Sequence, residues 1–190
     1  MTWEHYTEKV FKIREGDVVT ATDPCYDSDV PSAYLHLPAG EYDCMYDMVD
    51  EGDWGMRVAK CAILKKGAGA YIWDPDDALR QYAGSTGVDA GLAGFFINKP
   101  DYDDSAWDRF CKDLRKADKE DMQRTGRKYK NVYHTPEGFF TSSGFGDGEY
   151  NVYILDTGKE IVGAMIIFIS DECEDTYCDE GCMEDDYEED

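Results

Sequence analysis

Three short segments of the chain place a carboxylate among small residues, where a ligand or ion can approach the backbone. They are residues 22–26, 87–91 and 142–150, called here the first, second and third boxes. Glycine beside an acid permits positive φ and leaves the carboxylate uncrowded. If the three acids converge, they form a hard oxygen site suited to Ca²⁺ or Mg²⁺. The candidate ligand-binding residues are Asp23, Asp89, Gly91, Ser143, Gly146, Asp147 and Gly148, with Asp23, Asp89 and Asp147 as the metal ligands.

The same three acids have a simpler structural use. An Asp beside Gly or Pro commonly caps a turn by accepting hydrogen bonds from nearby backbone N–H groups. No calcium loop of alternating acids with a Glu at its twelfth position is present, so an EF-hand is excluded. Turn capping is therefore the commoner explanation, and a divalent-metal site is the alternative.

The second and third boxes, in this order and followed by an apolar strand, resemble a domain family of unknown function from bacteria and their phages. Members of that family carry a Val-Asp-Ala-Gly box and, later in the chain, a Ser-Gly-x-Gly-Asp-Gly-x-Tyr box. The resemblance covers about residues 35–169 and includes the Leu-Pro-x-Gly-x-Tyr segment at 37–42. Asn151 stands where the family usually has Pro. The resemblance implies a bacterial or phage origin and implies no activity.

Cysteine and histidine offer two further kinds of chemistry. The chain has 7 Cys and 3 His, and its first residues lack the basic and apolar regions of a secretory signal. An odd cysteine count without export predicts reduced thiols in a cytoplasm, either bacterial or that of a phage host. Cys173, Cys178 and Cys182 could supply thiolates to zinc, but without a Cys-x-x-Cys pair. Cys25 with a histidine could form a thiol-imidazole pair, although no spacing favours this over buried packing.

Charge argues against nucleic acid as a partner. The chain has 42 Asp+Glu, 19 Lys+Arg and a formal net charge of -23, whereas phosphate backbones attract Lys and Arg. Residues 171–190 hold 12 of the acids and no basic residue, which predicts a solvated tail after a globular domain at 1–170. Residues 109–130 hold nine basic and four acidic residues. We interpret this stretch as a solvated helix face, with contact to the acidic tail as the alternative.

Hydrophobic patterning predicts the fold class. The longest apolar run, 161–169, is too short to span a membrane, which needs about 20 residues, and fits a buried strand. Trp107, Phe110, Cys111, Leu114 and Ala117 recur at helical spacing behind Ser105, so we expect a helix that ends before Gly126. A short helix is expected at 78–83, and Gly52-Asp53 is expected to form a two-residue hairpin turn. The expected strands are 17–22, 32–37, 41–48, 55–65, 92–97, 132–135, 139–143, 150–155 and 161–169.

These elements predict an α+β fold, with an antiparallel sheet or sandwich of about nine strands and one main helix packed on it. Three functions remain open. The first is a non-enzymatic acidic binding protein, such as a phage accessory or inhibitory factor that engages a basic host protein. The second is a metal-dependent, hydrolase-like enzyme built on Asp23, Asp89 and Asp147. The third is a homo-oligomeric structural or small-ligand-binding protein whose aromatic residues form an interface.

Overall fold

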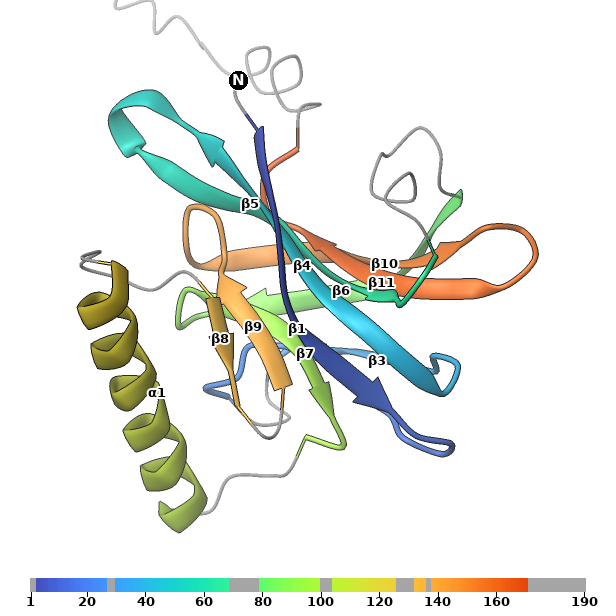
Figure 1. Ribbon diagram of the computed structural model, residues 1–190, viewed down its shortest axis with the longest axis horizontal. Coiled ribbons are helices and arrows are strands. Elements are labelled where there is room, and N and C mark those ends of the chain that lie inside the picture. The colour runs from blue at the N-terminus through green and yellow to red at the C-terminus, as the bar shows by residue number, and fades with distance from the viewer. Residues whose placement is uncertain are drawn as a thin grey trace, which may run out of the picture.

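Two antiparallel sheets pack face to face, and one helix lies outside the smaller sheet (Figure 1). The computed structural model describes residues 3–26, 30–68, 79–99, 104–125, 132–135 and 138–170. The larger sheet has, in spatial order, β1 (Trp3–Ile13), β4 (Gly40–Asp50), β5 (Met56–Lys65), β11 (Ile161–Ile167), β10 (Gly148–Asp156) and β6 (Leu79–Val88). The smaller sheet has β3 (Ala33–Leu35), β2 (Val19–Thr22), β7 (Leu92–Ile97), β9 (Gly138–Ser142) and β8 (Val132–His134).

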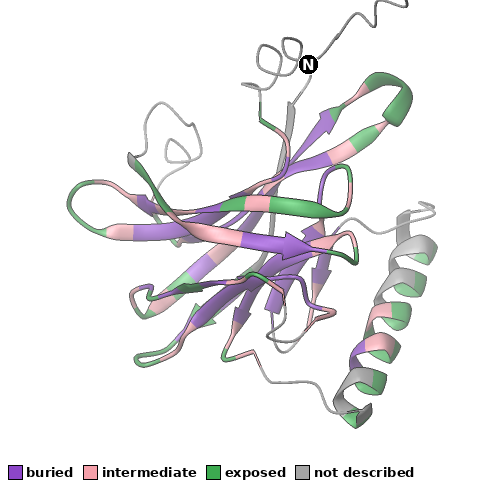
Figure 2. Ribbon diagram, turned by 180° about the vertical axis from the view of Figure 1, so that it is seen from behind, coloured by how far each residue is buried: buried purple, intermediate pink, exposed green. Residues whose placement is uncertain are grey.

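The main core lies between the two sheets, and Figure 2 shows the buried residues running along the strand interiors. Alternate residues of β4 divide between its two faces, as the period of two in a strand requires. Cys44 and Tyr46 belong to the core between the sheets, whereas Met45 joins a cluster on the outer face of the larger sheet. The larger sheet therefore buries apolar side chains on both faces at its centre.

The helix α1 (Asp104–Thr125) covers the outer face of the smaller sheet. Phe110 is buried against Phe96, Tyr133 and Phe140, and Leu114 packs against the same cluster. This helix confirms the prediction of one main helix that ends before Gly126. Its basic residues Arg109, Lys112, Arg115, Lys116 and Lys119 are exposed, as expected for a solvated helix face.

The prediction of a β-rich α+β fold with one main helix is confirmed, but the number of strands is corrected from about nine to eleven in the described residues. One added strand is β1. The other is β6, which occupies most of the stretch predicted as a helix at 78–83. Gly84, directly after the predicted helix, has a φ of 131° and lies at a register shift between β6 and β10. It is thus a bulge glycine inside a strand.

The predicted two-residue hairpin turn between β4 and β5 is also wrong. The connection runs from 51 to 55 and contains a 3₁₀ turn, Gly52–Trp54. A two-residue turn at Gly52-Asp53 would place Cys44 opposite Cys61. With the longer connection and a register shift beside Asp47, Tyr46 lies opposite Cys61 instead. The longer connection matters because it carries Trp54 beyond the end of the sheet.

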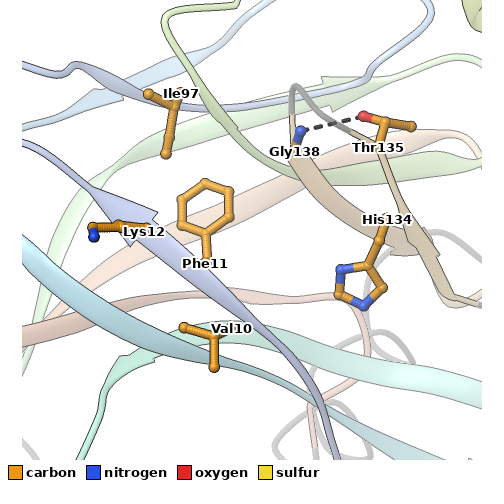
Figure 3. A pocket seen from close by; sticks show the side chains of 7 residues that line it. All are labelled: Val10, Phe11, Lys12, Ile97, His134, Thr135 and Gly138. Atoms are coloured by element: carbon orange, nitrogen blue, oxygen red, sulfur yellow. Dashed lines mark hydrogen bonds between the residues drawn. The ribbon is translucent and has the colours of Figure 1, made fainter.

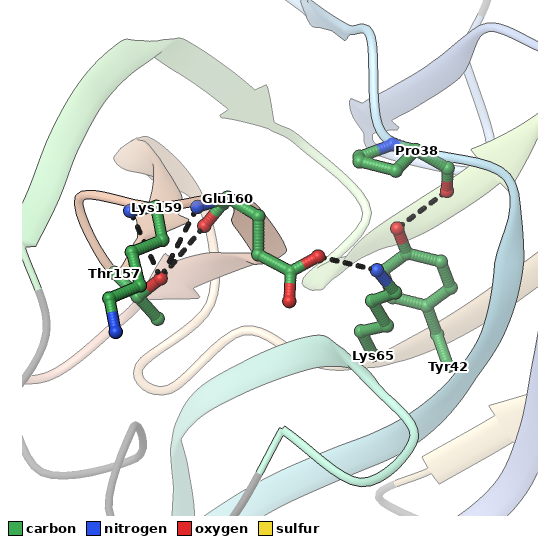
Figure 4. Close-up of polar contacts among 6 residues, drawn as sticks. All are labelled: Pro38, Tyr42, Lys65, Thr157, Lys159 and Glu160. Carbon is green, nitrogen blue, oxygen red and sulfur yellow. Dashed lines mark hydrogen bonds and ion pairs between the residues drawn. The ribbon is translucent and has the colours of Figure 1, made fainter.

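Figure 4 shows the hydrogen bonds and the ion pair that hold the turn before β4 and the turn between β10 and β11. The Tyr42 hydroxyl, on a fully buried ring, donates a hydrogen bond to the Pro38 carbonyl oxygen at 2.6 Å. Lys65 on β5 forms an ion pair with Glu160, 2.6 Å away, at the turn between β10 and β11. The Thr157 hydroxyl donates to the Glu160 carbonyl at 3.2 Å and closes that turn. Residues at the ends of separate hairpins are therefore tied together.

Two sequence predictions fall on parts of the chain outside the described residues. These are the solvated tail at 171–190 and its three-cysteine zinc alternative. Among the helices that are described, none has the length and apolar character needed to cross a membrane.

Candidate binding site at one end of the sandwich

The three boxes meet at one end of the sandwich, joined mainly through their backbones. Asp23 follows β2 and is fully buried. One of its carboxylate oxygens, Oδ1, accepts the Cys25 N–H at 2.8 Å. The other, Oδ2, accepts the N–H groups of Asp89 at 3.0 Å and Ala90 at 2.8 Å. A buried carboxylate that accepts three N–H groups is well satisfied, so Asp23 fixes the second box against the first.

The second box is joined to the third in turn. The Ser143 N–H donates to the Gly91 carbonyl oxygen at 3.1 Å. Gly91 has φ 65°, and a Cβ placed on it would lie 4.0 Å from the Cα of Gly146. The two turns therefore lie side by side, as the neighbouring turns after β6 and β9 in Figure 1 also show.

The third box is closed by a small hydrogen-bond network. The Ser143 hydroxyl donates to the Gly146 carbonyl oxygen at 2.8 Å, and the Gly146 N–H donates to the Ser143 carbonyl at 2.8 Å. The Tyr150 hydroxyl lies 2.8 Å from the Gly146 carbonyl oxygen and 3.1 Å from that of Ser143. Burial first, and then the charge of Asp147, raise the pKa of Tyr150, so its hydroxyl stays a donor at neutral pH.

The three acids do not gather as metal ligands. Asp23 is buried and occupied by backbone donors, whereas Asp89 and Asp147 are exposed. Within the described ranges, which include all three acids, no group of three or more His, Cys, Asp or Glu side chains could hold a metal ion. The capping interpretation accounts for Asp23. The Asp89 carboxylate instead accepts a hydrogen bond from the Tyr26 hydroxyl. This hydrogen bond, and then burial, raise the pKa of the Tyr26 phenol to about 12.

The thiol of Cys25, in the first box, is not an activated nucleophile. Cys25 packs against the aromatic cluster under α1. Burial, followed by the charge of Asp23, raises the pKa of its thiol to about 12. A thiol with this pKa is protonated at neutral pH and reacts slowly. None of the four described cysteines, Cys25, Cys44, Cys61 and Cys111, is in a disulfide bond.

Two exposed aromatic rings, one in the third box and one on the β4–β5 hairpin, were not predicted as site residues. Phe145, in the third box, is 56% exposed, and Trp54, at the tip of the β4–β5 hairpin, is 68% exposed. Their ring centroids are 6.2 Å apart, in an edge-to-face arrangement. The sequence does contain a signal for them. Each aromatic residue directly precedes a glycine and lies outside the expected strands, so its ring has no position in a strand that faces the core.

Exposed acids occupy the two segments that carry this aromatic pair and the neighbouring turn between β6 and β7. They come from the hairpin tip, the turn between β6 and β7, and the third box, and they are Asp50, Asp53, Asp89, Asp147 and Glu149. Arg57, on the same hairpin, is only half-exposed. We call Trp54, Phe145 and these five acids the acidic loop end. Its chemistry is that of a surface complementary to a cation with an apolar stem.

A separate hollow lies between β1 and the end of the smaller sheet (Figure 3). Its volume is about 490 Å³, which is within the range of small-molecule sites. Phe11 and Ile97 point toward its middle, whereas the Lys12 amine points away from them in Figure 3. None of the seven candidate residues from the boxes contributes to its described lining, which is Val10, Phe11, Lys12, Ile97, His134, Thr135 and Gly138.

Comparison with known proteins gives no family assignment: no protein-family model, curated protein or solved structure matches the chain.

Proposed function

We propose that this chain is a non-enzymatic binding protein that engages a basic protein through its acidic loop end. The observation that carries the proposal is a pair of exposed aromatic rings in contact, on two loops that also carry four exposed acids, with a fifth exposed acid on the turn beside the third box. Such a surface attracts Lys and Arg over a distance and gives fast, salt-sensitive association.

Two further observations support a binding role over catalysis. Asp23 and Ser143 are engaged in holding turns together, and the thiol of Cys25 has a raised pKa. The resemblance of the second and third boxes to a bacterial and phage domain family supports a bacterial protein as the partner. The proposal is thus an accessory or inhibitory factor that acts in the bacterial cytoplasm.

The experiment uses the full-length chain in three forms: unchanged, with the tail acids at 171–190 changed to amides, and with D50N, D53N, D147N and E149Q combined. Each is used to capture proteins from a bacterial lysate, and captured proteins are identified and purified. We expect a basic protein that binds the unchanged chain with an affinity that falls as the salt concentration rises. We expect its affinity for the loop-end variant to be lower than for the unchanged chain. The tail variant separates the contribution of the tail from that of the domain. Binding that is indifferent to salt and to the loop-end acids would contradict the proposal.

The small-ligand alternative rests on the hollow beside Phe11. It predicts that a library of small molecules contains compounds that shift the NMR signals of Phe11 and Ile97. Substitution of the loop-end acids would leave such binding unchanged, so the two candidate functions are separable.

A further inference from the structure

Trp54 and Phe145 are held in the positions where they are exposed. In the hairpin tip, the backbone N–H of Trp54 donates to the Glu51 carbonyl oxygen at 3.2 Å, and the backbone N–H of Gly55 donates to the Gly52 carbonyl oxygen at 2.9 Å. Gly52 and Gly55 both have positive φ, at 61° and 72°. Phe145 lies inside the loop closed by Ser143 and Tyr150. Both rings are therefore presented by turns with defined hydrogen bonds.

Both rings of this pair are exposed, whereas each other aromatic pair among the described residues has at least one ring that is buried or partly buried. The described core buries Phe95, Phe96, Phe139 and Phe140 completely. Trp54 and Phe145 instead contact each other and remain more than half exposed. Adjacent exposed aromatic side chains on a fixed frame are typical of residues that dominate a binding interface, because little ordering entropy is lost when the partner arrives.

The charge around the pair selects its occupant. Asp53 directly precedes Trp54, and Asp147 lies two residues after Phe145. A guanidinium group can stack on an aromatic face while its N–H groups bind a carboxylate, whereas an ammonium ion is more strongly hydrated and has no planar face. The chain already contains one such contact elsewhere, since the Arg80 guanidinium carbon lies 5.7 Å from the centroid of the Tyr153 ring.

We infer that Trp54 and Phe145 form the docking contact for an arginine side chain of the basic partner, with neighbouring loop-end acids binding its guanidinium group. This inference rests on the proposed function and specifies which side chain is recognised. A second copy of the chain is a poorer occupant, because two molecules of net charge -23 repel each other.

The test titrates the full-length chain with three peptides made of repeating Gly-Arg-Ser, Gly-Lys-Ser or Gly-Gln-Ser units. Binding at low ionic strength is followed by NMR of the tryptophan indole N–H signals, with the Trp54 signal assigned from W54F. The variants are W54A and F145A, and the matched control is Y34A, which removes a ring that is 64% exposed on β3. Circular dichroism and thermal unfolding check that each variant folds.

We expect the arginine peptide to bind more tightly than the lysine peptide and the glutamine peptide to bind least. W54A and F145A should each lower the affinity for the arginine peptide by about tenfold and reduce the ratio of its affinity to that of the lysine peptide. Y34A should change neither quantity. If F145A and W54A bind the arginine peptide as tightly as the unchanged chain, the docking inference is wrong while the proposed function stands. If no basic peptide binds, both are wrong. A dimer in sedimentation that W54A abolishes would show that a second copy occupies the surface, and would also overturn the inference.

Discussion

The carboxylate of Asp23 lies 2.8 Å from the backbone nitrogen of Ala90, a residue 67 positions later in the chain. This hydrogen bond joins the segment after β2 to the turn between β6 and β7, and thus connects an end of each sheet. Because the donor is a backbone group, the bond depends on Asp23 and not on the side chain at position 90.

Replacing Asp23 should therefore destabilise the fold. Asp23→Ala leaves the N–H groups of Cys25, Asp89 and Ala90 without their acceptor, and we expect a loss of about 3 kcal/mol in the free energy of unfolding. Urea denaturation measures this loss. Asp53→Ala, which removes an exposed acid, is the control and should change stability by less than about 0.5 kcal/mol. Equal effects of the two substitutions would show that the Asp23 bonds do not matter.

Divalent metal should not stabilise the domain. Asp23 is occupied by backbone donors, and the described part of the chain contains no group of metal-ligating side chains. We expect Ca²⁺ or Mg²⁺ to raise the thermal midpoint no more than sodium chloride of equal ionic strength does, since both only screen repulsion among the acids. A larger rise that disappears in the D89N/D147N variant would restore the metal-site hypothesis.

Removing the hydroxyl of Tyr150 should loosen the third box. Tyr150→Phe keeps the ring packed edge-on against Phe168 but removes the donor to the Ser143 and Gly146 carbonyls. The expected cost is about 1 kcal/mol. Hydrogen exchange at residues 144–147 should become faster than in the unchanged chain. Tyr82→Phe serves as the control because that ring is 64% exposed, and it should leave this exchange unchanged.

Stability should fall in alkali because of buried thiols. Burial raises the pKa of Cys61 from 9.0 to about 12. Between these values the folded chain keeps a proton that the unfolded chain has lost, so the free energy of unfolding decreases as pH rises. Cys61→Ala removes the part of this dependence that is due to Cys61. The free energy of unfolding of the variant, from urea denaturation, should therefore fall less than that of the unchanged chain between about pH 8 and about pH 10.

Val58→Ala provides the comparison for the alkaline experiment. Val58 is fully buried in the same cluster as Cys61 but carries no titratable group. Its substitution should lower stability by a similar amount at both pH values. If Cys61→Ala behaves in the same way, the thiol does not contribute to the alkaline loss.

Breaking a buried ion pair of the larger sheet should lower the free energy of unfolding much more than breaking an exposed one. Asp47 is 4% exposed and lies 3.2 Å from the Lys60 amine, on the neighbouring strand. Asp47→Ala leaves a covered ammonium group without this carboxylate, at an expected cost of about 3 kcal/mol. Glu41→Ala breaks an exposed pair with Lys66 and should cost less than about 0.5 kcal/mol. Thermal unfolding of both variants tests the contrast.

The elements predicted best from the sequence are those with an uninterrupted local pattern. Residues 92–97 form a continuous apolar run, and β7 has these bounds. By contrast, β1 has a register shift between Thr7 and Val10, which breaks the alternation that would have revealed it. For β6, the Asp-Pro-Asp-Asp run at 74–77 is typical of the start of a helix. The strand forms nonetheless, because pairing with β10 outweighs this local preference.

The site was less predictable for a different reason. The three boxes stand out in the sequence, since small residues around an acid give a local pattern, but their arrangement depends on hydrogen bonds between distant segments. Whether Asp23 reaches Ala90 is decided by how the two sheets stack, which no local spacing records. Trp54 and Phe145 were missed because an exposed aromatic side chain produces no periodic pattern.

The bonds that hold the acidic loop end have an evolutionary consequence. Asp23, Ser143 and Tyr150 attach mainly to main-chain atoms, which every amino acid supplies. The hairpin tip is likewise closed by backbone hydrogen bonds, so the side chains at positions 53, 54, 145 and 147 can diverge while the frame beneath them persists. A lineage of such proteins could acquire new binding partners by changing a handful of codons, much as antibody loops vary upon a constant scaffold.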